Sequence, residues 1–173
     1  MFVIETEVSC TFKNMHGNGR GKKGSKLLRK GRLSWVGPRY FIGSAIAQGA
    51  RNIDNQLCFS VICNELARLE QEETLFCEAL VVMSDHLHML IRLGSQKKIG
   101  QAMKLFKGRT AREINRQRNS TGALWFEGYH DHMLRPDEPV SYFLNYITLN
   151  PVKKGLCISP SDYPYLFVKT ENE

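Results

Sequence analysis

Two histidines, His86 and His88, interrupt an otherwise apolar run of the sequence. In an extended strand alternate side chains share a face, so the two imidazoles would lie about 6.5 to 7 Å apart on one side. That separation allows both rings to bind one cation. The neighbouring Leu87 and Met89 would point to the opposite face and join a hydrophobic core. Taken alone, the pair is compatible with a zinc site, a structural pair or neither.

Tyr146 and Asn150 form a second pair whose types could do chemistry. At roughly 100° per helical residue they lie about 40° apart, on the flank of a buried stripe. A tyrosine hydroxyl can act as a covalent nucleophile, and an asparagine oxygen can complete a divalent-metal shell begun by imidazoles. Each residue also has an ordinary explanation, because Tyr146 could simply pack and Asn150 could end a helix before proline.

The segments around these residues predict an α+β fold. β-rich apolar runs predict four strands, at residues 38–47, 75–83, 85–93 and 124–134. Helical periodicity predicts helices at residues 55–70 and 99–118, and a third after Asp137. This order is the split βαβ arrangement of a ferredoxin-like sandwich with an antiparallel sheet, and the third helix is an extra C-terminal one. The two central strands would pair as a hairpin.

The C-terminal helix would carry Tyr146, the candidate nucleophile. We expect Asp137 to cap this helix, Pro139 to occupy its first turn and Pro151 to end it. The preceding strand should be irregular around Gly128.

The composition is typical of one globular domain with a basic extension. The 173 residues are 42% hydrophobic and 24% charged, and no apolar run is long enough to span a membrane. Five cysteines without a C-x-x-C pair, and an acidic N-terminus unlike a secretory signal, predict a cytoplasmic protein without disulfides. We expect a partly flexible basic extension at residues 1–34, one folded domain that contains both candidate pairs at residues 35–168, and a tail at residues 169–173.

Net charge is +7, and from Val8 to Ile53 the chain has ten lysines or arginines and no acid. Such a block attracts polyanions through counterion release, although many basic segments are only solvated linkers. If the polyanion is a nucleic acid such as DNA, the extension offers Arg20, Lys22 and Lys23 as contacts. The helix predicted at residues 99–118 is basic on most of its exposed surface and adds Lys104, Lys107, Arg109 and Arg112, and Trp125 is an aromatic candidate. Trp125 and Tyr129 could stack unpaired bases, but a tryptophan next to Phe126 is more often part of a core.

Four segments together resemble the REP-associated tyrosine transposases of the HUH single-strand (Y1) transposase superfamily. They are residues 82–90 with the H-x-H motif, 105–115, 125–135, and 146–156 with Tyr-x-x-x-Asn-Pro-Val-Lys. The resemblance spans roughly residues 39 to 165. It implies that His86, His88 and Asn150 hold Mg²⁺ or Mn²⁺ and that Tyr146 attacks a phosphodiester. The implied function is to nick and rejoin single-stranded DNA near a hairpin through a 5′-phosphotyrosine intermediate.

The sequence departs from the family pattern at two positions. Ser84 stands where proline is common, and Asp85 stands where asparagine or glutamate is common. Neither residue is expected to touch the metal.

A second H-x-H is formed by His130 and His132, and it makes a rival zinc site of four histidines conceivable. Relatives vary at these two positions, so the resemblance favours a surface or supporting role for them.

Two further functions stay open. The chain could be a non-catalytic, RRM-like nucleic-acid binder, or a metal-dependent nuclease in which water attacks and Tyr146 is dispensable. Related transposases occur as homodimers that exchange the tyrosine and as monomers, and the sequence does not decide between them.

Overall fold

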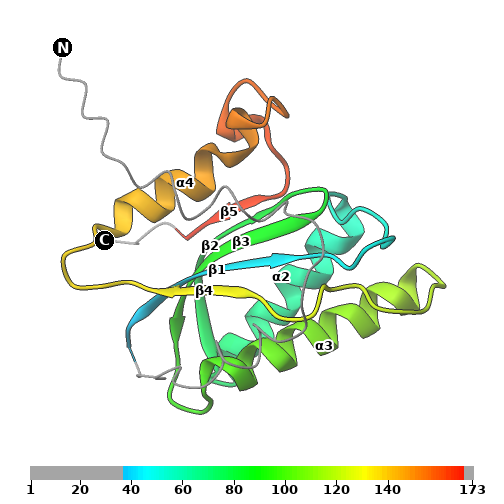
Figure 1. Cartoon of the computed structure of the whole chain (residues 1–173), viewed down its shortest axis with the longest axis horizontal. Coiled ribbons are helices and arrows are strands. Elements are labelled where there is room, and N and C mark those ends of the chain that lie inside the picture. Colours follow the sequence, from blue (N-terminus) through cyan, green and yellow to red (C-terminus); the bar gives the residue numbers. More distant parts are fainter. Residues whose placement is uncertain (1–36, 170–173) are drawn as a thin grey trace. The chain divides into compact units, whose positions relative to one another are not determined.

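The computed structural model describes residues 37–169 of the chain, and the predicted arm with Arg20, Lys22 and Lys23 lies outside this range. The elements are β1 (Arg39–Ala45), α2 (Gln56–Gln71), β2 (Leu75–Val82), β3 (His86–Leu93), α3 (Ile99–Gln117), β4 (His130–Met133), α4 (Val140–Lys153), the 3₁₀ turn η1 (Pro160–Asp162) and β5 (Leu166–Val168). Figure 1 shows their arrangement, and the predicted α+β class is confirmed. No helix in this range is long and apolar enough to cross a bilayer.

The sheet is antiparallel, with strand order β4-β1-β3-β2-β5. Its first four strands have the order that a split βαβ fold produces, as predicted. The hairpin of β2 and β3 is also confirmed, since the Met83 N–H donates to the His86 carbonyl at 2.8 Å across the turn. Strand β5 was not predicted. It adds three residues to the β2 edge, pairing Leu166 with Val81.

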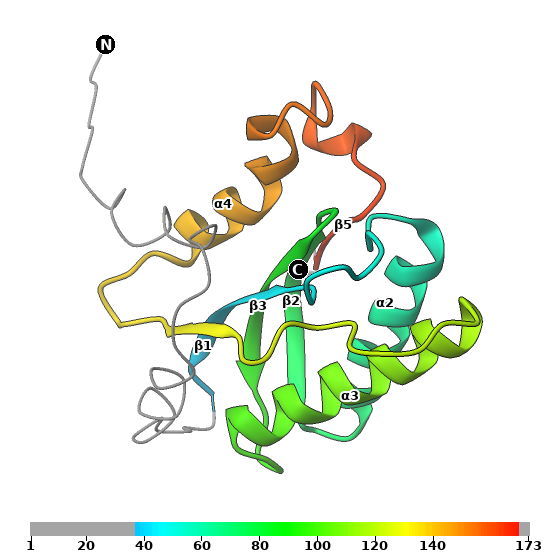
Figure 2. The ribbon, with the colours of Figure 1, turned by 45° about the vertical axis from the view of Figure 1, so that its right-hand side comes forward.

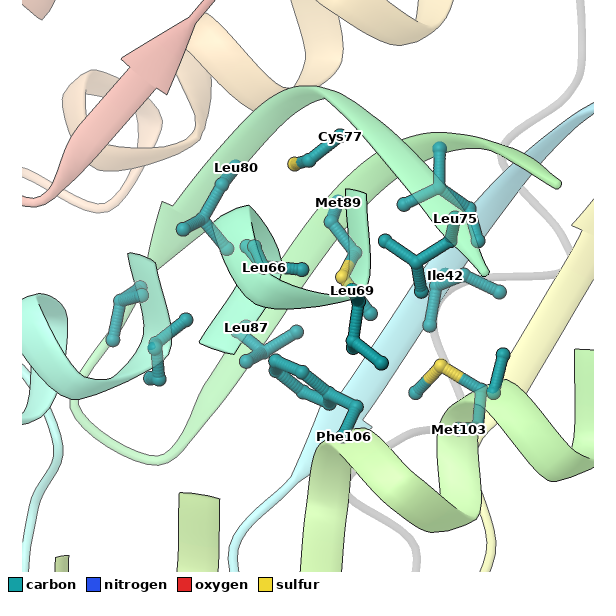
Figure 3. Close-up of a cluster of buried hydrophobic side chains, with 14 of the residues drawn as sticks. Ile42, Leu66, Leu69, Leu75, Cys77, Leu80, Leu87, Met89, Met103 and Phe106 are labelled. Atoms are coloured by element: carbon teal, nitrogen blue, oxygen red, sulfur yellow. The ribbon is translucent and has the colours of Figure 1, made fainter. Parts of the chain in front are cut away.

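One face of the sheet packs on α2 and α3 and forms the core. Figure 3 shows Leu66 from α2 and Phe106 from α3 directed toward the sheet residues Ile42, Leu87 and Met89. Alternation along β3 explains this, because Leu87 and Met89 have the same orientation and are fully buried. The same alternation turns the two histidines of β3 to the other face.

Helix α4 covers part of that other face. It contacts β2, β3 and β5 and lies on the side of the sheet opposite α2 and α3 (Figures 1 and 2). The predicted ends of this helix were wrong by a few residues. Pro139, not Asp137, is the N-cap residue, and the helix continues through Pro151 to Lys153. Proline removes only one backbone bond in this last turn, and the Lys154 N–H still donates to the Asn150 carbonyl at 3.1 Å.

The fourth strand is shorter than predicted. Regular pairing is confined to β4, although Trp125 forms an isolated bridge with Ile46, the residue that follows β1. The irregularity expected at Gly128 is confirmed, because its φ of 89° lies in the left-handed region and interrupts an extended strand.

Candidate active site

His86 and His88 lie on the sheet face covered by α4, opposite Ala45 and Gly43 of β1 respectively. Their ring centroids are 4.9 Å apart, with the ring planes at 74°. The prediction that both imidazoles share one face is therefore met in the geometry. The rings converge more closely than two extended-strand residues at this spacing would require.

His88 is 2% exposed and is enclosed by aromatic rings. It stacks on Phe41 at 5.2 Å and meets Tyr146 edge-on at 5.3 Å between centroids. Burial, followed by the neighbouring His86, lowers the pKa of His88 to about 3, so its ring is neutral near pH 7. Its Nδ1 is buried and has no hydrogen-bond partner within residues 37–169. A neutral imidazole with an unsatisfied nitrogen is suited to bind a cation.

His86 is held by the residue before it. Its Nδ1 lies 2.6 Å from Oδ1 of Asp85, and the His86 side chain is 14% exposed. Because a carboxylate only accepts, Nδ1 must carry the proton of this bond, which leaves the lone pair of the neutral ring on Nε2. A carboxylate behind a ligand histidine fixes its tautomer and orientation in many metal sites.

Tyr146 and Asn150 approach the histidines from α4. Tyr146 is half-buried, contacts His88 as described and packs edge-on against Phe41 at 5.4 Å between centroids. Burial raises the pKa of Tyr146, and a side-chain hydrogen bond with Asn150 partly opposes this. Asn150 itself is 6% exposed. The two residues predicted from helical spacing thus meet each other, and Tyr146 joins them to the histidine pair.

The rival four-histidine zinc site is not assembled. His130 lies across Gly43 from His88, but His132 is bound by Glu138, with 2.9 Å between Nε2 and Oε2, and stacks on Phe143. Residues 37–169 contain no group of three or more His, Cys, Asp or Glu side chains able to hold a metal. The two imidazoles and the Asn150 amide remain the candidate donors in this part of the chain.

Two predicted DNA contacts on α3 have partners within the fold. Arg109 Nη1 donates to Glu65 at 3.1 Å and to Glu72 at 3.1 Å, which ties α3 to α2. Lys107 donates through Nζ to backbone carbonyls of the segment after Trp125. DNA contact by these two side chains would compete with those bonds. Lys104 and Arg112 are exposed, and DNA contact by them stays a prediction.

Trp125 belongs to the core, the alternative that the sequence favoured. It is 7% exposed, its Nε1 donates to Thr110 Oγ1 at 3.0 Å, and its ring packs near Phe106. In this structure the indole has no open face for a base. Tyr129 is partly buried against the same core.

Sequence reasoning missed the roles of Asp85 and Phe41. Asp85 directly precedes His86 in the hairpin turn, so its proximity was readable from the sequence, although its hydrogen bond was not. Phe41 stacks on His88 from the adjacent strand, and this contact depends on the register of β1 against β3. An apolar strand offers no local signal for that register.

The family model described as "Transposase IS200 like" matches residues 53–150, more than half of the chain. The chain belongs to the IS200-like transposase family. The matched range includes both histidines, Tyr146 and Asn150. The resemblance to REP-associated tyrosine transposases that the sequence motifs indicated is confirmed by two further similarities.

A Haemophilus influenzae protein named for the REP-associated tyrosine transposases is 28% identical to this family member. The similarity covers 50% of the chain and 55% of that relative, so the match spans about half of the relative's length. The solved structure of a REP-associated tyrosine transposase bound to a REP hairpin is similar with a TM-score of 0.64 and 18% identity. It covers 78% of this chain and 79% of the other, and it shows that the IS200-like chain has the same fold.

Proposed function

We propose that the chain is a metal-dependent single-stranded DNA transesterase that nicks and rejoins DNA near a hairpin through Tyr146. The observation that carries this proposal is the contact of Tyr146 with His88 at 5.3 Å between ring centroids. This contact brings Tyr146, the candidate nucleophile on α4, against His88, a candidate metal ligand on β3 of the same chain. Family membership supports the transposase class, and the REP hairpin in the similar solved structure supports hairpin DNA as the substrate.

His86, His88 and Asn150 would hold the divalent cation, and the buried, neutral imidazole of His88 is the observation that best fits a cation ligand. Two imidazoles and one amide oxygen are a mixed donor set, which fits Mn²⁺ more closely than the oxygen-preferring Mg²⁺. When bound, the cation would polarise the scissile phosphate and offset the negative charge that develops during transfer.

The protein's own groups would perform the transfer. The Tyr146 oxygen attacks phosphorus, the phosphorus–O3′ bond breaks, and a tyrosine–phosphate bond to the 5′ side forms. The proton that Tyr146 loses is balanced by the one that the released 3′ oxygen takes up. Because one phosphodiester replaces another, a second 3′-hydroxyl can reverse the step and join new ends. His88 stays neutral throughout, since its pKa of about 3 keeps it unprotonated.

A single chain carries all these groups. Helix α4 packs on its own sheet, through contacts with β2, β3 and β5, and brings Tyr146 to its own histidines. The proposed reaction therefore needs no tyrosine from a second subunit.

A denaturing gel tests the proposal. The protein is mixed with Mn²⁺ and a pool of hairpin oligonucleotides with randomised single-stranded flanks, and we expect a covalent protein–DNA band that Tyr146→Phe abolishes. Tyr142→Phe, on the same helix and 46% exposed, is the matched control and should keep the band. Nicking that survives Tyr146→Phe would indicate the water-dependent nuclease, and binding without nicking would indicate the passive RRM-like binder.

A further inference from the structure

We infer that Phe126 is a stacking platform for an unpaired nucleobase of the DNA held at the histidine site. The inference deepens the proposed function and rests on it for the DNA substrate. Phe126 is 61% exposed, more than any other aromatic side chain within residues 37–169. A large apolar ring in water is unfavourable unless something covers it, and an unpaired base offers a flat apolar face of similar size.

The backbone of Phe126 lies close to the candidate active site. Its N–H donates to the carbonyl of Ala45 at 2.9 Å, and Ala45 is the register partner of His86. Ala45 thus lies between Phe126 and His86 across the sheet. Two spacings between adjacent strands place the two backbones about 10 Å apart. This is close enough for a nucleotide beside the phosphate that Tyr146 would attack.

The ring of Phe126 belongs to the face that carries the histidines. Trp125 is buried among the residues of the α2 and α3 side, opposite Ile46. Alternation in an extended segment sends the next side chain to the other face, and the exposure of Phe126 agrees with this. The left-handed φ of Gly128 then turns the chain away two residues later.

Lys107 fixes this platform in place. Its Nζ donates to the Phe126 carbonyl at 2.7 Å and also to the Gly128 carbonyl. With the N–H of Phe126 bound to Ala45, the backbone is anchored on both sides of the ring. Little backbone freedom remains to be lost when a base stacks, which favours binding. The +7 charge of the chain supplies the general attraction for a polyanion that accompanies stacking in single-strand binders.

The test separates base stacking from phosphate binding. In a Tyr146→Phe background, which prevents reaction, fluorescence anisotropy measures binding of an oligothymidylate of about 15 nucleotides and of an abasic strand of the same length. We expect Phe126→Leu to weaken binding of the oligothymidylate roughly tenfold and to leave the abasic strand unchanged. Phe126→Tyr should retain the affinity. Phe167→Leu, an exposed phenylalanine on β5, is the matched control and should change neither.

Three results would overturn the inference: oligothymidylate binding that Phe126→Leu leaves unchanged, equal loss on both strands, and no oligothymidylate binding by the chain that keeps Phe126. Failure of the proposed reaction would look different. The covalent band with Tyr146 would then be missing, while the base-dependent loss in Phe126→Leu would persist. An intact covalent band without that loss would leave the reaction standing and remove the platform.

Discussion

Asp85 determines which nitrogen His86 presents to the candidate metal site. The 2.6 Å separation between Asp85 Oδ1 and His86 Nδ1 assigns the proton to Nδ1. Asp85 can reach the ring because it lies in the turn before β3 rather than in the strand.

Replacing this carboxylate should weaken cation binding at the candidate site without disturbing the fold. We expect Asp85→Asn to lower the affinity for Mn²⁺ by roughly tenfold or more, because a neutral amide orients the His86 ring less firmly. Free Mn²⁺ is followed by electron paramagnetic resonance during titration. Asp137→Asn, at an exposed aspartate before α4, is the matched control. Unchanged affinity in Asp85→Asn would show that the contact does not support a metal ligand.

Much of the site could be predicted at the level of residues because two periodicities fix it. The period of two in a strand placed His86 and His88 on one face, and helical spacing placed Tyr146 near Asn150. The enclosing ring of Phe41 could not be predicted, since it depends on which residues pair across strands. The burial that lowers the pKa of His88 depends on the same pairing.

The basic side chains of helix α3 are of two kinds. Some hold the fold together, and others face solvent. Arg109 bridges to Glu65 and Glu72 of the α2 region and is 27% exposed, whereas Glu65 is 10% exposed. An ion pair so placed is worth more than one on the open surface, because removing the cation leaves a partly buried carboxylate unpaired. Arg112 is exposed.

These two arginines should therefore respond differently to alanine substitution. We expect Arg109→Ala to lower the free energy of unfolding by about 1 to 3 kcal/mol, and Arg112→Ala to change it by less than about 0.5 kcal/mol. Urea unfolding followed by circular dichroism measures both. The opposite order for DNA affinity, with the larger loss in Arg112→Ala, would accompany this result. Equal stability of the two variants would mean that the Glu65 and Glu72 contacts contribute nothing.

At the level of elements, the long periodic segments were predicted well and the short or interrupted ones were not. Helices α2 and α3 carry apolar stripes several turns long, so their existence and limits are strongly specified. Strand β5 has three residues and too little pattern to be detected. Pro151 predicted a helix end, but the bond from Lys154 to Asn150 continues the helix past it. The helical hydrogen bonds of the last turn outweighed the usual preference of the residue before a proline for an extended conformation.

Charge is a property of the whole chain, and much of it precedes residue 37. If Arg20, Lys22 and Lys23 contact DNA phosphates, replacing all three with glutamine removes three sites of counterion release. The slope of log affinity against log salt concentration for single-stranded DNA should then become shallower by about 2. A series of anisotropy titrations at increasing salt measures the slope.

The control for this prediction is Lys169→Gln. Lys169 already pairs with Glu70 at 2.9 Å, so its loss should leave the salt dependence of binding unchanged. An unchanged slope in the triple variant would support the alternative that the basic extension is a linker.

Strand β3 also limits how the chain can tolerate changes in length. Substitutions at His86 or His88 fall on the face of the candidate active site, and substitutions at Leu87 or Met89 fall on the core face. Deleting one residue from the preceding turn would exchange the two sets, because a shift of one reverses every side chain. Imidazoles would enter the core and aliphatic side chains would lie beneath Tyr146. The number of residues in this turn is therefore more strongly constrained than the identity of any one of them.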